Sequence, residues 1–182
     1  FWDSEMIRHG SFIIQQRQLM TDELNRLAPP IHSSISSGES LQVNYLPSVS
    51  IEGFRKRLQE VRKREIALRM SVVGPHRDDM SFTINGNDVN TFGSRGQQRT
   101  AALSLKLAEA EYLSLKLNDA PVILLDDVLS ELDATRRHQL LDAVSGYNQV
   151  VITTTDIDYF EPGFLSNAAQ FAVKDGAVIP TR

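Results

Sequence analysis

The sequence predicts an α/β protein, with a parallel sheet and flanking helices, preceded by a helical arm or lid segment. The first observation is the order after residue 97, where long helical patterns alternate with short apolar runs, as is typical of a parallel sheet. The second is a pair of amphipathic helical patterns before residue 70. The third is composition, because 41% apolar and 23% charged residues in a chain of 182 are typical of globular proteins. We therefore expect an arm or lid subdomain over residues 1–70 and a sheet-bearing portion over residues 71–182.

The first expected helix covers residues 4–27. Its apolar stripe repeats every seven positions, which is typical of a helix packed against a partner: Met6, Ile13, Met20 and Leu27. Pro29 and Pro30 predict the end of this helix, since proline inside a helix removes a hydrogen bond and clashes with the preceding turn. The serine-rich residues 32–40 then predict a loop, and residues 41–46 a short strand.

The second expected helix covers residues 50–70 and has a basic side. Its apolar residues recur at alternating spacings of three and four, which places the basic residues on the opposite side. Six of them form a candidate DNA-binding surface, called here the basic face: Arg55, Lys56, Arg57, Arg62, Lys63 and Arg64. The net charge of −4 argues against a uniformly basic protein, but a local patch can still contact phosphates. An ordinary solvated helix face is the alternative.

The segment that follows Gly74 predicts a turn and then a hairpin. Residues 80–84 favour a strand, and Asn85-Gly86 favours a two-residue turn from which the chain returns through Val89. His76 stands beside the acids Asp78 and Asp79, a group that could hold a metal ion. A single histidine beside acids is more often part of a hydrogen-bonded turn, so we expect a structural role near the sheet edge.

The remaining elements follow in the order helix, strand, helix, strand. They are expected over residues 97–117, 122–125, 133–144 and 150–153. A final hairpin is expected where Lys174-Asp175-Gly176 separates two apolar runs.

An apolar strand that ends in two carboxylates is the strongest chemical signal. Residues 122–125 lead directly into Asp126 and Asp127, here called the acid pair, which places both at the carboxyl edge of the sheet, where α/β proteins build their sites. This is the geometry of a Walker B motif. Asp126 could hold Mg²⁺, which favours oxygen ligands, and Asp127 could polarise an attacking water. The alternative is a strand that ends in a solvated acidic turn.

A glycine-bearing turn opens the helix expected from residue 97. Its residues Ser94, Arg95, Gly96 and Gln97, here called the signature turn, offer backbone N–H groups and a favourable helix dipole to a phosphate. Simple helix capping is the alternative. Asp133 likewise predicts an N-cap for the following helix.

Three segments together resemble the RecF family, within the ABC and SMC-like class of ATPases. They are Gly-Pro-His-Arg-Asp-Asp at 74–79, Thr-Phe-Gly-Ser-Arg-Gly-Gln-Gln-Arg-Thr at 91–100 and Leu-Leu-Asp-Asp-Val-Leu-Ser-Glu-Leu-Asp at 124–133. The resemblance covers residues 74–155 specifically, and the preceding helical segment is less specifically similar to the arm or lid of that family. The resemblance implies that the chain folds as the carboxyl-terminal half of an ABC-type P-loop ATPase head.

The resemblance also implies a role for each matching residue. The signature turn would meet the γ-phosphate of ATP bound to a second protomer, so that nucleotide clamps a homodimer. Asp126 would bind Mg²⁺ and Asp127 would activate water, with slow turnover because many ABC proteins carry the longer glutamate there. Ser130 and Asp133 would belong to the D-loop at the dimer seam. Thr155 falls where transporters carry a switch histidine, and threonine cannot titrate near neutral pH.

The chain lacks the pattern Gly-x-x-x-x-Gly-Lys-Ser/Thr that cradles the β- and γ-phosphates. We therefore expect it to supply half of an ATP site and to bind ATP poorly alone. It starts at Phe1 with no initiator methionine or leader, which we interpret as an internal cut. The absence of cysteine excludes disulfides and is compatible with a bacterial cytoplasm, and no run approaches the roughly 18 to 20 apolar residues of a membrane span.

Three functional hypotheses follow. The favoured one, from the resemblance, is a DNA-dependent ATPase of recombinational repair that acts at single-strand gaps and duplex junctions with mediator proteins such as RecR and RecO. The second is a module that binds DNA or a partner without ATP. The third is a two-metal nuclease, in which Asp156 and Asp158 would join the acid pair.

Overall fold

The computed structural model describes residues 2–181, which divide after Pro121 into two compact units. Unit 1 comprises residues 2–121 and unit 2 comprises residues 122–181. The division expected at residue 70 falls inside unit 1, because the strand at Leu41–Leu46 pairs with the strand at Asp79–Ile84 in one sheet.

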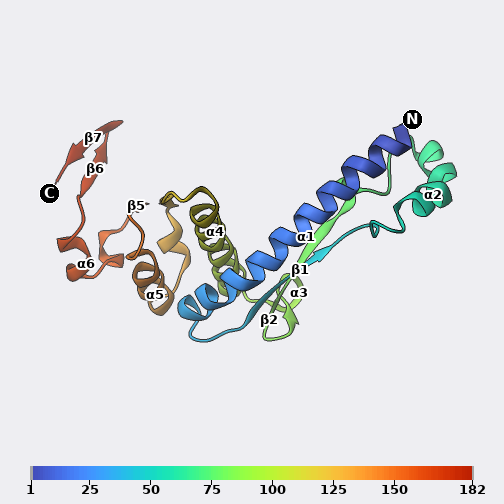
Figure 1. Cartoon of the computed structure of the whole chain (residues 1–182). Helices are drawn as coiled ribbons and strands as arrows, with labels where there is room; N and C mark the ends of the chain where they lie inside the picture. Colours follow the sequence, from blue (N-terminus) through green and yellow to red (C-terminus); the bar gives the residue numbers. More distant parts are fainter. Residues whose placement is uncertain (1, 182) are drawn as a thin grey trace. The chain divides into compact units, whose positions relative to one another are not determined.

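Unit 1 is built around one long helix, α1, which spans Trp2–Ile35 and lies along strand β1 (Figure 1). The prediction that Pro29 and Pro30 end this helix was wrong, because the helix continues to Ile35, and the loop expected over residues 32–40 begins only after it. The two prolines remove two backbone donors, but Ala28, His32 and Ile35 are all buried on the last turns. Burial of this face compensates for the lost hydrogen bonds.

An antiparallel sheet lies against α1. Strand β1 (Leu41–Leu46) pairs with β2 (Asp79–Ile84), which turns at Asn85-Gly86 into the short β3 (Asn87–Asp88). Both turn residues have positive φ, 50° and 80°, as the predicted tight hairpin requires. The strand expected to return through Val89 stops one residue earlier, because the Asp88 carboxylate accepts a hydrogen bond from Thr91 N at 2.8 Å and caps helix α3 (Val89–Phe92).

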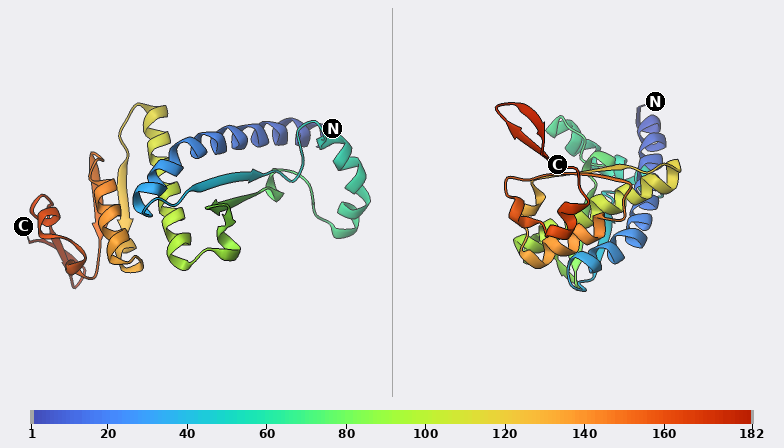
Figure 2. Two further views of the ribbon diagram at one scale, coloured as in Figure 1. Left: turned by 90° about the horizontal axis from the view of Figure 1, so that it is seen from below. Right: turned by 90° about the vertical axis from the view of Figure 1, so that its left-hand side faces the viewer.

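Two hydrophobic clusters stabilise unit 1. The first joins α1 and β1 to helix α4 (Arg95–Leu117), which crosses the carboxyl-terminal part of α1 (Figure 2): Leu24, Leu27, Ala28, Leu41, Ile84, Val89, Ala101 and Ala108. The second joins α1 to helix α2 (Phe54–Leu68): Ile14, Val49, Phe54, Leu58, Val61 and Val73. Helix α2 is shorter than the expected 50–70, since residues 51–53 form a turn. A short helical turn, η1 (Pro75–Arg77), leads into β2.

Unit 2 begins with two parallel strands, β4 (Val122–Asp126) and β5 (Gln149–Thr153). Between them lie the short helix η2 (Val128–Glu131) and helix α5 (Ala134–Val144). The expected order of strand, helix and parallel strand is therefore confirmed. After η3 (Ile157–Tyr159) and α6 (Pro162–Ser166), strands β6 (Phe171–Lys174) and β7 (Ala177–Pro180) form the expected hairpin.

None of the helices in residues 2–181 combines the length and the apolar character that crossing a membrane requires.

Candidate functional site

The acid pair lies at the carboxyl end of β4, as the sequence predicts. Asp126 is the last residue of the strand and is exposed. Its Oδ1 accepts a hydrogen bond of 2.5 Å from the hydroxyl of Thr153, its register partner at the end of β5. The two parallel strands therefore present a carboxylate and a hydroxyl side by side at one edge.

Asp127 begins the turn that follows the strand. Its backbone is left-handed, with φ 50° and ψ 23°, and its N–H donates to Thr153 Oγ1 at 3.0 Å. Thr153 thus bonds to both members of the acid pair. Sequence reasoning singled out Thr155 and missed Thr153, although the parallel alignment of the two strand ends was a signal that could have found it.

The residues expected to form the D-loop follow at once. Ser130 donates to the carbonyl of Asp127 at 2.8 Å, and Asp133 accepts from Arg136 N at 3.0 Å, which confirms its predicted role as the N-cap of α5. Arg137 was also missed by sequence reasoning. Its Nε lies 3.0 Å from the carbonyl of Leu129 and 2.9 Å from that of Leu132, so this side chain holds the turn in shape.

The residues after β5 form a compact turn. Thr155 is exposed there, and its predicted catalytic role remains a prediction. Asp156 accepts a hydrogen bond from Asp158 N at 2.9 Å and caps η3. Among residues 2–181 no three acidic or histidine side chains are grouped so that they could hold a metal ion. The nuclease hypothesis therefore gains no support from the geometry.

The signature turn lies in unit 1, at the start of α4. Ser94 is the N-cap, and a capping box joins it to Gln97: Gln97 N donates to Ser94 Oγ at 3.2 Å, and Ser94 N donates to Gln97 Oε1 at 3.0 Å. Ser94 and Arg95 are exposed, whereas Gly96 and Gln97 are half-buried. The capping role is confirmed, and the exposed turn remains available to a ligand.

The basic face is fully exposed along α2. Its six residues fall in two groups of three that lie seven positions apart, so Arg55 and Arg62 share one side of the helix. Two of the six form ion pairs: Arg57 with Glu60 at 3.1 Å and Arg62 with Asp3 at 3.2 Å. Exposed ion pairs of this kind contribute little to stability.

Comparisons with known proteins agree with this geometry. The chain is 44% identical over 178 residues to the DNA replication and repair protein RecF of Lachnoclostridium phytofermentans and 43% identical over 185 residues to that of Bacillus cytotoxicus. These alignments cover 97% and 96% of the chain and 49% and 50% of the relatives. A solved structure of the recombination mediator protein RecF with ATP matches 99% of the chain at TM-score 0.79 and 32% identity. No family model matches the chain.

The chain belongs to the RecF family. It corresponds to the carboxyl-terminal part, and it spans about half the length of the curated RecF relatives it matches. A solved SMC ATPase structure matches 92% of the RecF-family chain at TM-score 0.53 and 15% identity, which shows a shared fold. The predicted fold class, half of an ABC-type ATPase head with a helical segment, is thereby confirmed.

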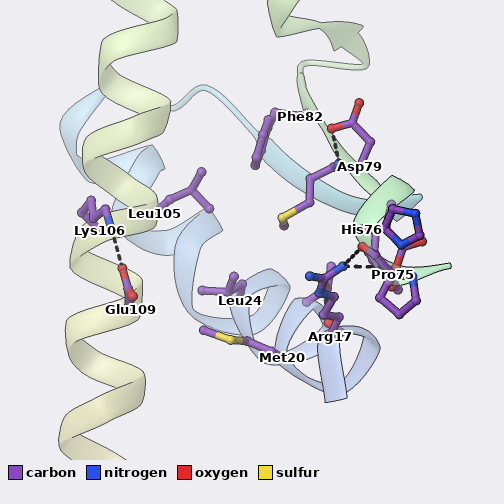
Figure 3. A pocket seen from close by; sticks show the side chains of 14 residues that line it. Arg17, Met20, Leu24, Pro75, His76, Asp79, Phe82, Leu105, Lys106 and Glu109 are labelled. Carbon is purple, nitrogen blue, oxygen red and sulfur yellow. Dashed lines mark hydrogen bonds and ion pairs between the residues drawn. The ribbon is translucent and has the colours of Figure 1, made fainter. Parts of the chain in front are cut away.

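This RecF segment also contains a cleft of about 730 Å³ within unit 1, between α1, α4 and β2 (Figure 3). Met20, Leu24, Phe82 and Leu105 supply its apolar lining. At one end Arg17 donates to the carbonyl of Pro75 at 2.5 Å. Sequence reasoning did not foresee the cleft, because it forms between elements far apart in the chain.

Asp78, at the cleft, has a structural role, as expected for the turn after Gly74. Its side chain is 1% exposed and accepts hydrogen bonds from the Tyr45 hydroxyl, from Ser48 N at 2.8 Å and from Arg17 at 3.2 Å. Burial raises the pKa of Asp78, but these hydrogen bonds and the Arg17 charge outweigh it and hold that pKa below its usual value. Burial and the bond to Asp78 raise the pKa of Tyr45 to about 12.

Proposed function

We propose that the full-length protein is a DNA-dependent ATPase of recombinational repair that clamps onto DNA gaps or junctions as an ATP-bound homodimer. The observation that carries this is the acid pair at the end of a parallel strand, bonded to Thr153, in a chain 44% identical to a RecF. In this proposal the chain supplies half of the ATP site, because the phosphate cradle is outside it. Its mediators would be proteins such as RecR and RecO.

Asp126 suits a Mg²⁺ ion. It is an exposed hard oxygen ligand, and Thr153 fixes its orientation through Oδ1. Mg²⁺ commonly binds one or two carboxylates together with phosphates and waters, so a cluster of protein ligands is unnecessary. When bound, the ion would neutralise charge on the phosphates. Asp127, whose backbone is left-handed, would accept the proton of the attacking water.

The signature turn suits a phosphate. It opens a helix of 23 residues, whose amino-terminal N–H groups and dipole favour an anion. Ser94 and Arg95 are exposed there. In a dimer this turn would meet the γ-phosphate of ATP held by the other protomer, so nucleotide would join the two copies. Ser130 and Asp133 would lie at the same seam, and Thr155 would bond to phosphate or water.

The nucleotide half of the proposal is tested by titrating a fluorescent ATP analogue with Mg²⁺. We expect binding by the full-length protein, only weak binding by residues 1–182 alone, and loss of Mg²⁺-dependent hydrolysis in full-length Asp126→Asn. Asp119→Asn, an exposed acid outside the site, is the control and should hydrolyse ATP normally. Tight Mg-ATP binding by residues 1–182 alone would contradict the half-site.

The DNA half is tested by measuring affinity for gapped duplex against salt concentration. Reversing Arg55, Lys56, Lys63 and Arg64 to glutamate should weaken binding of the full-length protein and flatten the salt slope, because fewer phosphates are neutralised. The single reversal Lys106→Glu, exposed on α4, is the control for a charge change outside α2. If reversing these four charges on α2 leaves the affinity for DNA unchanged, the basic face does not bind DNA. DNA affinity that is unaffected by nucleotide would favour the ATP-independent module instead.

A further inference from the structure

A chain of polar side chains in unit 1 runs from the signature turn to the carboxyl-terminal end of α1. Gln97 is its first member. Its Oε1 accepts the N–H of Ser94 at 3.0 Å, and its Nε2 donates to Glu39 Oε1 at 2.7 Å. Because one end of the amide faces a donor and the other faces a carboxylate, only one orientation of the amide satisfies both.

Glu39 is itself held in place by the turn that ends α1. Ser37 and Gly38 have positive φ, 58° and 97°, and Gly38 N donates to the carbonyl of Ser33 at 3.0 Å, which reverses the chain. Glu39 N then donates to Ser36 Oγ at 3.2 Å, and Ser36 Oγ donates to the carbonyl of His32 at 2.5 Å. The backbone of Glu39 is therefore fastened to the end of the helix.

His32 lies beside the second oxygen of the Glu39 carboxylate in the core. Its side chain is 0% exposed, and its Nδ1 lies 2.9 Å from Ser104 Oγ on α4. The single hydroxyl proton of Ser104 is donated to the carbonyl of Thr100 at 2.7 Å, so Ser104 accepts a hydrogen bond from His32 Nδ1–H. His32 Nε2 then faces Glu39 Oε2 at 3.6 Å, an ion pair when the ring is protonated.

We propose that Glu39 is a positioning residue for the signature turn. By accepting from Gln97 Nε2, Glu39 fixes the amide that in turn holds the N–H of Ser94, the residue at the tip of the turn. A hydrogen bond to a carboxylate is stronger than a neutral one, which suits this task. The inference rests on the proposed function for its effect on ATP-dependent dimerisation, but not for its effect on the turn itself.

The first test compares Glu39→Ala with Glu39→Gln in the full-length protein. Dimerisation in Mg-ATP is measured by analytical ultracentrifugation, and Mg-ATP affinity by titration of the monomer. Glu39→Ala should weaken the dimer about tenfold or more, since an orienting hydrogen bond to a charged group is lost, and should leave monomer affinity for ATP unchanged. Glu39→Gln keeps an oxygen acceptor and should restore dimerisation to within about twofold of wild type. Glu23→Ala, which breaks only an exposed pair with Arg26 on α1, is the control.

The second test needs no nucleotide. Hydrogen exchange of the Ser94 amide should become about tenfold faster in Glu39→Ala, because Gln97 no longer holds it, and should stay near wild type in Glu39→Gln and Glu23→Ala. Unchanged exchange in Glu39→Ala would overturn the proposal, as would equal losses in Glu39→Ala and Glu39→Gln. If the wild-type protein does not dimerise in ATP, the proposed function fails, and the exchange experiment still decides whether Glu39 positions the turn.

Discussion

The sheets of the two units are covered differently. In unit 1 the sheet is covered by α1, and Phe54 is 0% exposed at the centre of the second cluster. In unit 2 both sheets have two strands and leave large apolar side chains in solvent, with Leu124 71% exposed on β4 and Val173 74% exposed on β6. Parallel strands in globular proteins are normally covered on both faces, and isolated two-stranded sheets are marginally stable.

The difference lies in the sheets, because unit 1 covers its sheet with its own helix whereas the strands of unit 2 leave apolar side chains in solvent. Unit 1 combines two hydrophobic clusters and a network of buried polar groups around Asp78 and His32. In unit 2 the apolar residues of one face, Val122, Leu124 and Val151, are exposed at the strands that carry the acid pair. The chain spans about half of its RecF relatives, so we expect the remainder of the protein to cover that face.

The largest expected effect on stability is in the core of unit 1. Phe54→Ala removes a fully buried ring and should lower the free energy of unfolding of unit 1 by roughly 3–5 kcal/mol, measured by urea denaturation. Phe12→Ala is the control, because that ring is 60% exposed on α1 and its loss should change stability by less than about 0.5 kcal/mol. Equal effects would show that α2 does not pack on α1 in solution.

The next effect concerns the buried carboxylate of Asp78. Asp78→Asn should cost about 2 kcal/mol near neutral pH, since the neutral amide is a weaker partner for Arg17 and Tyr45. The pKa of Asp78 is lowered by folding, so the stability it contributes is present above its unfolded pKa, near 3.8, and is lost as pH falls through the lower folded value. Urea midpoints measured from pH 7 down to pH 2 should therefore fall less steeply in Asp78→Asn.

Tyr45 should affect the pH dependence of stability on the alkaline side, as Asp78 does on the acidic side. Its pKa rises from 10.0 to about 12 on folding, so its contribution is present below pH 10 and is lost between pH 10 and about 12. Tyr45→Phe should abolish the part of the alkaline loss that arises from this hydroxyl. If both substitutions leave the pH profile unchanged, the Asp78 network does not stabilise unit 1.

An effect of comparable size is expected from crowding at a glycine. A side chain at Gly10 would bring its Cβ to 2.6 Å from Phe54 Cε1, so Gly10→Val should cost roughly 1–3 kcal/mol through displaced packing. Gly163, in α6 of unit 2, has no atom within 4 Å of such a Cβ, and Gly163→Ala should be neutral or slightly stabilising. Thermal unfolding of both variants measures how much more tightly unit 1 is packed. A loss in Gly163→Ala equal to that in Gly10→Val would contradict the comparison.

Sequence reasoning succeeded where the signal is local. The hairpins and the caps at Ser94 and Asp133 follow from residues adjacent in the chain, and the parallel pair follows from the order strand, helix, strand. It failed at Pro29 and Pro30, where burial of distant surfaces overrides a local preference, and at Val89, where Asp88 caps a helix. The basic face is exposed on a helix as expected, but its contact with DNA remains a prediction.

The site was predicted in part for the same reason. Asp126 and Asp127 could be found because the strand that carries them ends at the sheet edge. Thr153, Arg137 and Glu39 were missed because their importance depends on neighbours 27, 8 and 58 positions away in the chain, respectively. The cleft beside Asp78 is likewise a product of packing between α1, α4 and β2.

The smallest effect, and the sharpest test of the comparison, is at the exposed face of β4. Leu124→Thr keeps a residue suited to strands and should change the stability of residues 1–182 by less than about 0.5 kcal/mol, because Leu124 is already in solvent. Leu125→Ala, one position along the same strand but buried, should cost about 2–4 kcal/mol and serves as the control. In the full-length protein Leu124→Thr should become costly, by about 1–2 kcal/mol in urea denaturation, if the remainder of the protein covers this face. A substitution that stays neutral in the full-length protein would show that the face remains open, and the acid pair would then belong to a sheet with one uncovered face.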